Sequence, residues 1–99
     1  MYPWISAEEL ERLLPDIEAA GVSTVARGPD GFATAYRRLR SPEEMAITVV
    51  PGYATQTWCQ RRNAFIARTL PAYTANPTHR RALSLLAWAY APPSHGLIF

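Results

Sequence analysis

The residues best suited to chemistry in this sequence lie on one expected helix in the second half of the chain. Segment 55–69 has helical spacing, and Trp58, Arg62 and Phe65 fall on one face of it at about 100° per residue. Arg62 therefore lies inside an apolar stripe rather than opposite it. An arginine in that position needs a partner, because burial of an unpaired charge is very costly.

Two interpretations of Arg62 stay open. In the first, Arg62 forms an internal ion pair with a carboxylate from the front half of the chain, or extends its charge to solvent along apolar surface. In the second, Trp58 and Arg62, which are i, i+4 neighbours able to stack, belong to an exposed patch that binds protein or nucleic acid. Arg61 and Arg68 form a basic ridge on the neighbouring edge, which is either a solvated face or part of that patch.

A second group of cations opens the last expected helix. Asn76 and Pro77 fit its cap and first turn, and His79, Arg80 and Arg81 follow directly. Cations in a first turn oppose the helix dipole, whereas an anion bound over the free N–H groups would offset that cost. That anion is either a glutamate of this chain or a nucleic-acid phosphate.

The sequence gives little support for catalysis. Cys59 and His79 are the only nucleophile and base that invite pairing, and a lone cysteine beside a tryptophan is typical of a small packed side chain. Cys59, His79 and His95 lack the spacing of metal ligands. Glycine-rich phosphate loops, nucleophile elbows and HExxH patterns are absent. We expect no catalytic residue, no metal and no cofactor.

Composition indicates one domain, residues 1–99, because 99 residues that are 48% hydrophobic suffice for one core and are too few for two. All eight acidic residues lie in the first 44 positions, and from Met45 onward there are five arginines, two histidines and no acid. The chain thus has an acidic front and a basic back. Every basic residue except the histidines is arginine, whose planar fork suits carboxylate or phosphate.

The same numbers favour a cytoplasmic protein. The single cysteine excludes an intrachain disulfide, which a small secreted domain usually needs. The N-terminus lacks the basic region and apolar run of a signal peptide. No stretch approaches the roughly 18 apolar residues of a membrane span.

The first helix has the clearest local signals. Ser6 and Glu9 fit a capping box, apolar residues then recur at helical spacing, and Gly21 is a natural stop. Pro15 should kink the helix or restart it, because proline removes a backbone donor.

Residues 22–50 allow two interpretations. Segments 22–26 and 47–50 have strand character and would pair as a minor two-stranded element. Alternatively, Asp30 caps a helix over 32–39, and Ser41, followed by a proline, starts a short one.

The C-terminal half predicts two helices. The 55–69 helix should end before Pro71, and the last helix should run from Pro77 through Tyr90. The last helix is apolar nearly all round, which favours a central position against the other two long helices. The predicted fold is mainly α: a small orthogonal bundle of three to five helices, with or without the β element.

Two runs in this half resemble a known pattern. They are Thr57-Trp58-x-x-Arg61-Arg62-x-x-Phe65-Ile66-x-Arg68 and Pro77-Thr78-x-Arg80-Arg81-x-Leu83 through Trp88-Ala89-Tyr90-x-Pro92. The pattern resembles small uncharacterised accessory proteins of proteobacterial plasmids and integrative elements. The resemblance implies a bacterial origin and a mobile-element context, and it brings no activity or site residues.

These observations predict a small non-enzymatic accessory or regulatory protein that acts by protein–protein interaction, with a homodimer as one form of it. The alternative is a nucleic-acid-binding module that uses arginines of the C-terminal half on phosphates. The predicted binding residues are Trp58, Arg61, Arg62, Arg68, His79, Arg80 and Arg81.

Overall fold

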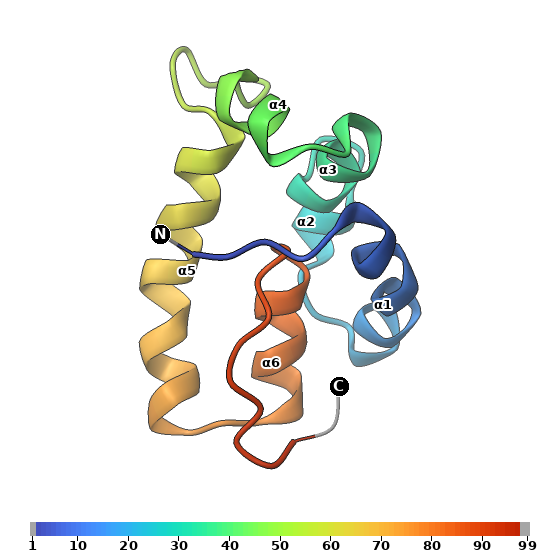
Figure 1. The fold of residues 1–99 in the computed structure, drawn as a ribbon, viewed down its shortest axis with the longest axis vertical. Coiled ribbons are helices and arrows are strands. Elements are labelled where there is room, and N and C mark those ends of the chain that lie inside the picture. Colours follow the sequence, from blue (N-terminus) through green and yellow to red (C-terminus); the bar gives the residue numbers. More distant parts are fainter. Residues whose placement is uncertain (1, 98–99) are drawn as a thin grey trace.

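The computed structural model describes residues 2–97, and within that range α-helices form the whole framework (Figure 1). Five helices are joined by loops, and a single helical turn, α2, lies between the first two. Their bounds are α1 (Ala7–Ala20), α2 (Thr24–Arg27), α3 (Phe32–Leu39), α4 (Pro42–Ile47), α5 (Trp58–Ala75) and α6 (His79–Leu86). The prediction of a small, mainly α bundle is confirmed.

Helix α6 lies at the centre of the bundle, as its apolar composition predicts. It contacts α1 on one side and α5 on the other (Figure 1). Leu83, Leu85 and Leu86 are buried there. None of the helices in residues 2–97 is long and apolar enough to cross a membrane.

The ends of α1 follow the local signals. The backbone N–H of Glu9 donates to Ser6 Oγ at 3.1 Å, and Gly21 ends the helix in the left-handed conformation at φ 69°. The Glu9 carboxylate pairs with Arg12 instead of completing the capping box. Pro15 lies inside the helix without interrupting it.

The predicted boundary between the last two helices is wrong. Helix α5 continues through Pro71 to Ala75, and α6 starts later and is shorter than predicted, with Thr78 rather than Asn76 as its N-cap. The reason is tertiary: Tyr73 is completely buried in a cluster with Ile66 and residues of α6. Its burial outweighs the hydrogen bond that Pro71 cannot donate.

The predicted β pairing of 22–26 with 47–50 is also wrong. Residues 24–27 form the turn α2, and Val49 makes only an isolated bridge, to Thr57. The helical alternative holds for this region, although Gly31 rather than Asp30 is the N-cap of α3. Gly31 is required there, because a Cβ would come 2.2 Å from the carbonyl oxygen of Val25.

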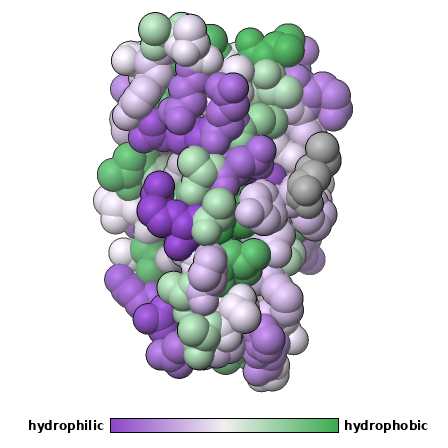
Figure 2. Space-filling view, turned by 90° about the vertical axis from the view of Figure 1, so that its left-hand side faces the viewer, coloured by the Kyte–Doolittle hydropathy of each residue, from purple (hydrophilic) through white to green (hydrophobic). Residues whose placement is uncertain are grey.

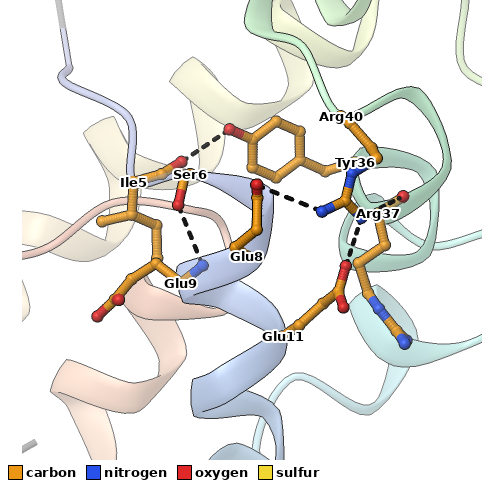
Figure 3. Close-up of polar contacts among 8 residues, drawn as sticks. All are labelled: Ile5, Ser6, Glu8, Glu9, Glu11, Tyr36, Arg37 and Arg40. Atoms are coloured by element: carbon orange, nitrogen blue, oxygen red, sulfur yellow. Dashed lines mark hydrogen bonds and ion pairs between the residues drawn. The ribbon is translucent and has the colours of Figure 1, made fainter.

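Polar contacts join α1 and the segment just before it to α3 and its C-cap (Figure 3). Arg40 pairs with Glu11 at 2.5 Å and with Glu8 at 3.3 Å, and the Tyr36 hydroxyl donates to the carbonyl of Ile5 at 2.7 Å. The Arg40 hydrogen bond lowers the pKa of the Glu11 carboxyl. Three of the eight carboxylates of the acidic front half, Glu8, Glu9 and Glu11, thus pair with cations on α1 and at the end of α3.

Candidate functional site

Arg62 is a buried structural hub. It is 1% exposed, and its guanidinium donates four hydrogen bonds to backbone carbonyls from both ends of the chain. Nε bonds to Trp88 at 2.7 Å, Nη1 to Tyr2 at 3.1 Å, and Nη2 to Pro3 at 2.7 Å and Ala89 at 3.1 Å. These bonds tie the N-terminal segment and the loop after α6 to the N-terminal part of α5.

Both interpretations of Arg62 therefore need correction. No carboxylate of residues 2–97 pairs with it, so the ion-pair prediction is wrong. Its burial also excludes Arg62 from an exposed patch. It stacks on Trp4, with 3.8 Å between its Cζ and the ring centroid, and not on Trp58. Burial lowers its pKa to about 10, so the group still carries its charge at neutral pH.

Trp58 and Cys59 belong to the interior side of α5. Trp58 is 2% exposed and meets Phe32 edge-on, with 6.1 Å between ring centroids, so it too is absent from the surface. The half-buried Cys59 thiol lies 3.7 Å from the carbonyl oxygen of Pro42, and burial raises its pKa. A raised pKa is the opposite of what an activated nucleophile needs.

Two of the three cations at the start of α6, Arg80 and Arg81, have internal partners, and neither partner is the glutamate that the sequence analysis gave as one alternative. Arg80 donates to the carbonyl of Ala20 at the end of α1, and Arg81 donates to the carbonyl of Asn76 at 3.0 Å. A cation at a helix C-terminus is favourable for that helix's dipole, which offsets the cost at α6. His79 is exposed.

Three aromatic rings stack in a row from the core to the surface. Trp88 lies between Phe32 and Phe65, with centroid distances of 4.8 Å and 4.6 Å and interplanar angles of 23° and 16°. Both faces of the indole are therefore covered. Trp88 is 9% exposed and Phe65 is half-buried, so the outer end of the stack reaches solvent.

The outer end of this stack forms the floor of two adjoining hollows. One, of about 220 Å³, is lined by Gln56, Arg61, Ala64, Phe65, Arg68 and Trp88. The other, of about 410 Å³, is lined by Ser23, Thr24, Val25, Ala26, Phe65, Ser84 and Trp88. Because both include Phe65 and Trp88, we treat them as one depression between α5 and α2 and call it the aromatic groove.

The charged residues that line the aromatic groove are all positive. Arg61 and Arg68 line it, and no lining residue is acidic. Arg61 lies 4.6 Å over the Tyr53 ring and donates to Gln56 Oε1 at 3.3 Å, while Arg68 lies 5.9 Å from the Phe65 centroid. Within residues 2–97, neither arginine forms an ion pair.

Another hollow lies on the lower half of α5. It measures about 500 Å³ and is lined by Tyr2, Ala67, Leu70, Pro71, Thr74 and Ala75. Figure 2 looks onto the α5 side, where hydrophilic residues lie in the upper half and along both margins of the lower half, and apolar or neutral ones follow the middle of the lower half. This hollow has no charged lining residue, and therefore offers a ligand little orientation.

The structure thus brings together Arg61 and Arg68 of the predicted binding residues and places Trp58 and Arg62 in the core. His79, Arg80 and Arg81 lie at the start of α6 and do not line the groove. Sequence reasoning missed Val25, Phe65 and Trp88 as groove residues. Val25 is 80% exposed, and an apolar residue beside a glycine-rich turn was the only signal for it. No cluster of potential metal ligands occurs in the described part of the chain.

No family model, curated protein or solved structure matches this chain.

Proposed function

We propose that this protein is a small non-enzymatic accessory protein that binds a segment of a partner protein in the aromatic groove. The observation that carries the proposal is the three-ring stack, whose outer end, Phe65 and the edge of Trp88, forms the floor of a solvent-open groove. A rigid aromatic floor with adjacent arginines is the arrangement typical of a binding hot spot.

The groove is suited to binding rather than to reaction. Its lining holds hydroxyls, an amide and two guanidinium groups, and no histidine, cysteine or carboxylate to act as base or activated nucleophile. The exposed Val25 on one side offers apolar surface that a partner would cover. A rigid floor also lowers the entropy cost of binding, since the stacked rings are already ordered.

A photo-cross-linking comparison tests this proposal. A photoreactive residue is placed at Val25, and separately at Ile47, which is 73% exposed and lies outside the groove. In native cells we expect a defined protein adduct from position 25 and none from position 47. Ser84→Trp, which fills the larger hollow from its half-buried side, should abolish the adduct. Equal labelling at both positions, or an adduct that Ser84→Trp leaves unchanged, would contradict the proposal.

Nucleic-acid binding is the second candidate, because Arg61 and Arg68 lack carboxylate partners within residues 2–97. Arg80 and Arg81 support it less, since each already donates to a backbone carbonyl. Titration into labelled DNA and RNA at low and moderate salt separates the two functions. Tight binding whose affinity falls steeply with salt, and which Arg61→Gln/Arg68→Gln removes, would favour the nucleic-acid function.

We further propose the cytoplasm as the compartment and a mobile-element setting for this function, on the sequence pattern alone. The solution mass of the protein tests a homodimer, whose interface would then compete with the partner for apolar surface such as Val25.

A further inference from the structure

We infer that the partner segment is acidic, and that it carries one large apolar side chain that anchors on the edge of Trp88. This inference rests on the proposed function, because it names the chemistry of the segment that the aromatic groove takes. It follows from three properties of the groove: its unbalanced charge, the spacing of its cations and the covered faces of its rings.

The charge argument is local. Eight carboxylates of the chain lie at positions 8 to 44, and three of them pair with Arg12 and Arg40 on α1 and beside α3. None of the eight lines the aromatic groove, where Arg61 and Arg68 stay without ion-pair partners among residues 2–97. Two unpaired cations at the edge of an apolar floor favour an anionic partner and disfavour a cationic one.

The spacing argument defines the segment further. Arg61 and Arg68 are seven residues apart on α5 and are therefore separated by about 10 Å along the helix axis. An extended chain covers that distance in about three residues. Side chains of an extended chain alternate between its two faces, so two carboxylates four residues apart and a large apolar residue midway between them share one face. The long, flexible arginine side chains can span the difference between that spacing, about 13 Å, and their own separation of about 10 Å, while the apolar side chain enters the groove. Ser23, Thr24 and Ser84, which line the larger of the two hollows, offer hydroxyl oxygens as acceptors for its backbone N–H groups, and the Ser84 hydroxyl itself already donates to the Arg80 carbonyl.

The ring geometry favours a peptide over a nucleic acid. Base stacking requires an open ring face, and both faces of Trp88 are covered, by Phe32 and Phe65. The outer side of Phe65 faces the Arg68 guanidinium at 5.9 Å. The groove therefore presents an aromatic edge, against which an aliphatic or aromatic side chain packs.

Selection from an unbiased library of displayed peptides, using the whole protein as bait, tests the inference. We expect the selected peptides to carry Asp or Glu four residues apart, with a large apolar residue midway between them. Their affinity, measured by fluorescence anisotropy, should fall about tenfold in Arg61→Gln/Arg68→Gln, since two exposed charge pairs contribute about a factor of three each. Arg37→Gln/Arg38→Gln, which removes the same charge from exposed positions on α3, should change it less than about twofold.

The outcomes separate the inference from the function on which it rests. Selected peptides that are neutral or basic, yet lose binding in Val25→Asp, would overturn the acidic partner and keep the groove. Peptides whose affinity changes neither in Val25→Asp nor in Arg61→Gln/Arg68→Gln would overturn the acidic partner and also the groove as the binding site. An oligonucleotide that competes with the acidic peptides at the same arginines, and binds more tightly, would assign the groove to nucleic acid instead. A synthetic peptide of α1 (Ala7–Ala20) that displaces the selected peptides, together with a dimeric solution mass, would identify the acidic α1 of a second copy as the segment and overturn a separate partner.

Discussion

The guanidinium of Arg62 lies 3.8 Å from the centre of the Trp4 ring, which covers a face of the cation that its four backbone carbonyl partners leave open. The cation is thus enclosed by carbonyl dipoles and a ring face, and needs no carboxylate. Carbonyl oxygens and aromatic faces both carry negative potential, and together they replace the hydration that burial removes. The same bonds fix residues 2, 3, 88 and 89 against α5, and so hold Trp88 in place at the groove.

Replacement of this buried cation should destabilise the fold strongly. Arg62→Met leaves four carbonyls without their donor, and we expect the free energy of unfolding to fall by about 3 kcal/mol. Urea denaturation monitored by circular dichroism measures the change. Arg12→Met is the control: its side chain is 70% exposed, and its loss should cost no more than about 0.5 kcal/mol. An Arg62→Met variant as stable as the parent protein would show that the hub contributes nothing.

The ion pair between Arg40 and Glu11 should shape the acid sensitivity of the protein. The folded pKa of Glu11 lies below its unfolded value, so its stabilising contribution is present above the unfolded pKa and is lost as pH falls through the folded one. Arg40→Gln should raise the pKa of Glu11 and flatten the decline of stability in that acidic window. Titration of the Glu11 carboxyl by NMR measures the pKa. Arg12→Gln, which leaves Glu11 untouched, should not move it.

Gly31 should tolerate no side chain. A Cβ there would lie 2.2 Å from the Val25 oxygen and 2.3 Å from the Ala26 oxygen, and both are backbone atoms that cannot move without displacing α2. We expect Gly31→Ala to lower the free energy of unfolding by about 3 kcal/mol. Gly28→Ala, where the nearest atom is 3.3 Å away, should cost clearly less. Thermal denaturation of the two variants side by side makes the comparison, and equal melting temperatures would contradict it.

Pro71 should destabilise α5, and its replacement should make the protein more stable. It cannot donate to the carbonyl one turn earlier, at Ala67, so Pro71→Ala should raise the free energy of unfolding by about 1–2 kcal/mol despite the greater freedom of the unfolded chain. Pro51→Ala, in an exposed turn, should bring no gain. Urea denaturation of both variants tests this. A loss of stability in Pro71→Ala would mean that the proline shapes the helix in a way that alanine cannot.

Cys59 should react slowly for a free thiol. Burial raises its pKa, so the thiolate that attacks alkylating reagents is scarce at neutral pH. We expect alkylation by iodoacetamide to be slower than that of a small free thiol and to accelerate with rising pH up to the raised pKa. Mass spectrometry over time measures the rate. Rapid alkylation at neutral pH would indicate an activated cysteine and would reopen the question of catalysis.

The sequence by itself determined the parts of this fold that depend on neighbouring residues. Ser6, Gly21 and Ser41 mark helix ends where capping rules place them, because a cap joins groups only three or four residues apart. The apolar stripes identified the long helices, and the nearly all-apolar last helix correctly indicated the centre of the bundle. The strand-like segments 22–26 and 47–50 misled, because apolar β-branched residues also suit a buried turn or an exposed loop.

Only the tertiary structure decided where Arg62 and Trp88 act. Every residue carries the same carbonyl group, so an arginine that bonds to carbonyls of residues 2, 3, 88 and 89 leaves no mark on its partners' sequence. A carboxylate partner, by contrast, would have been visible in the sequence as an aspartate or glutamate. The aromatic groove likewise depends on Phe32, Phe65 and Trp88, which are far apart in the chain and become neighbours through packing alone. Local rules set the helices, and contacts between distant residues set the site.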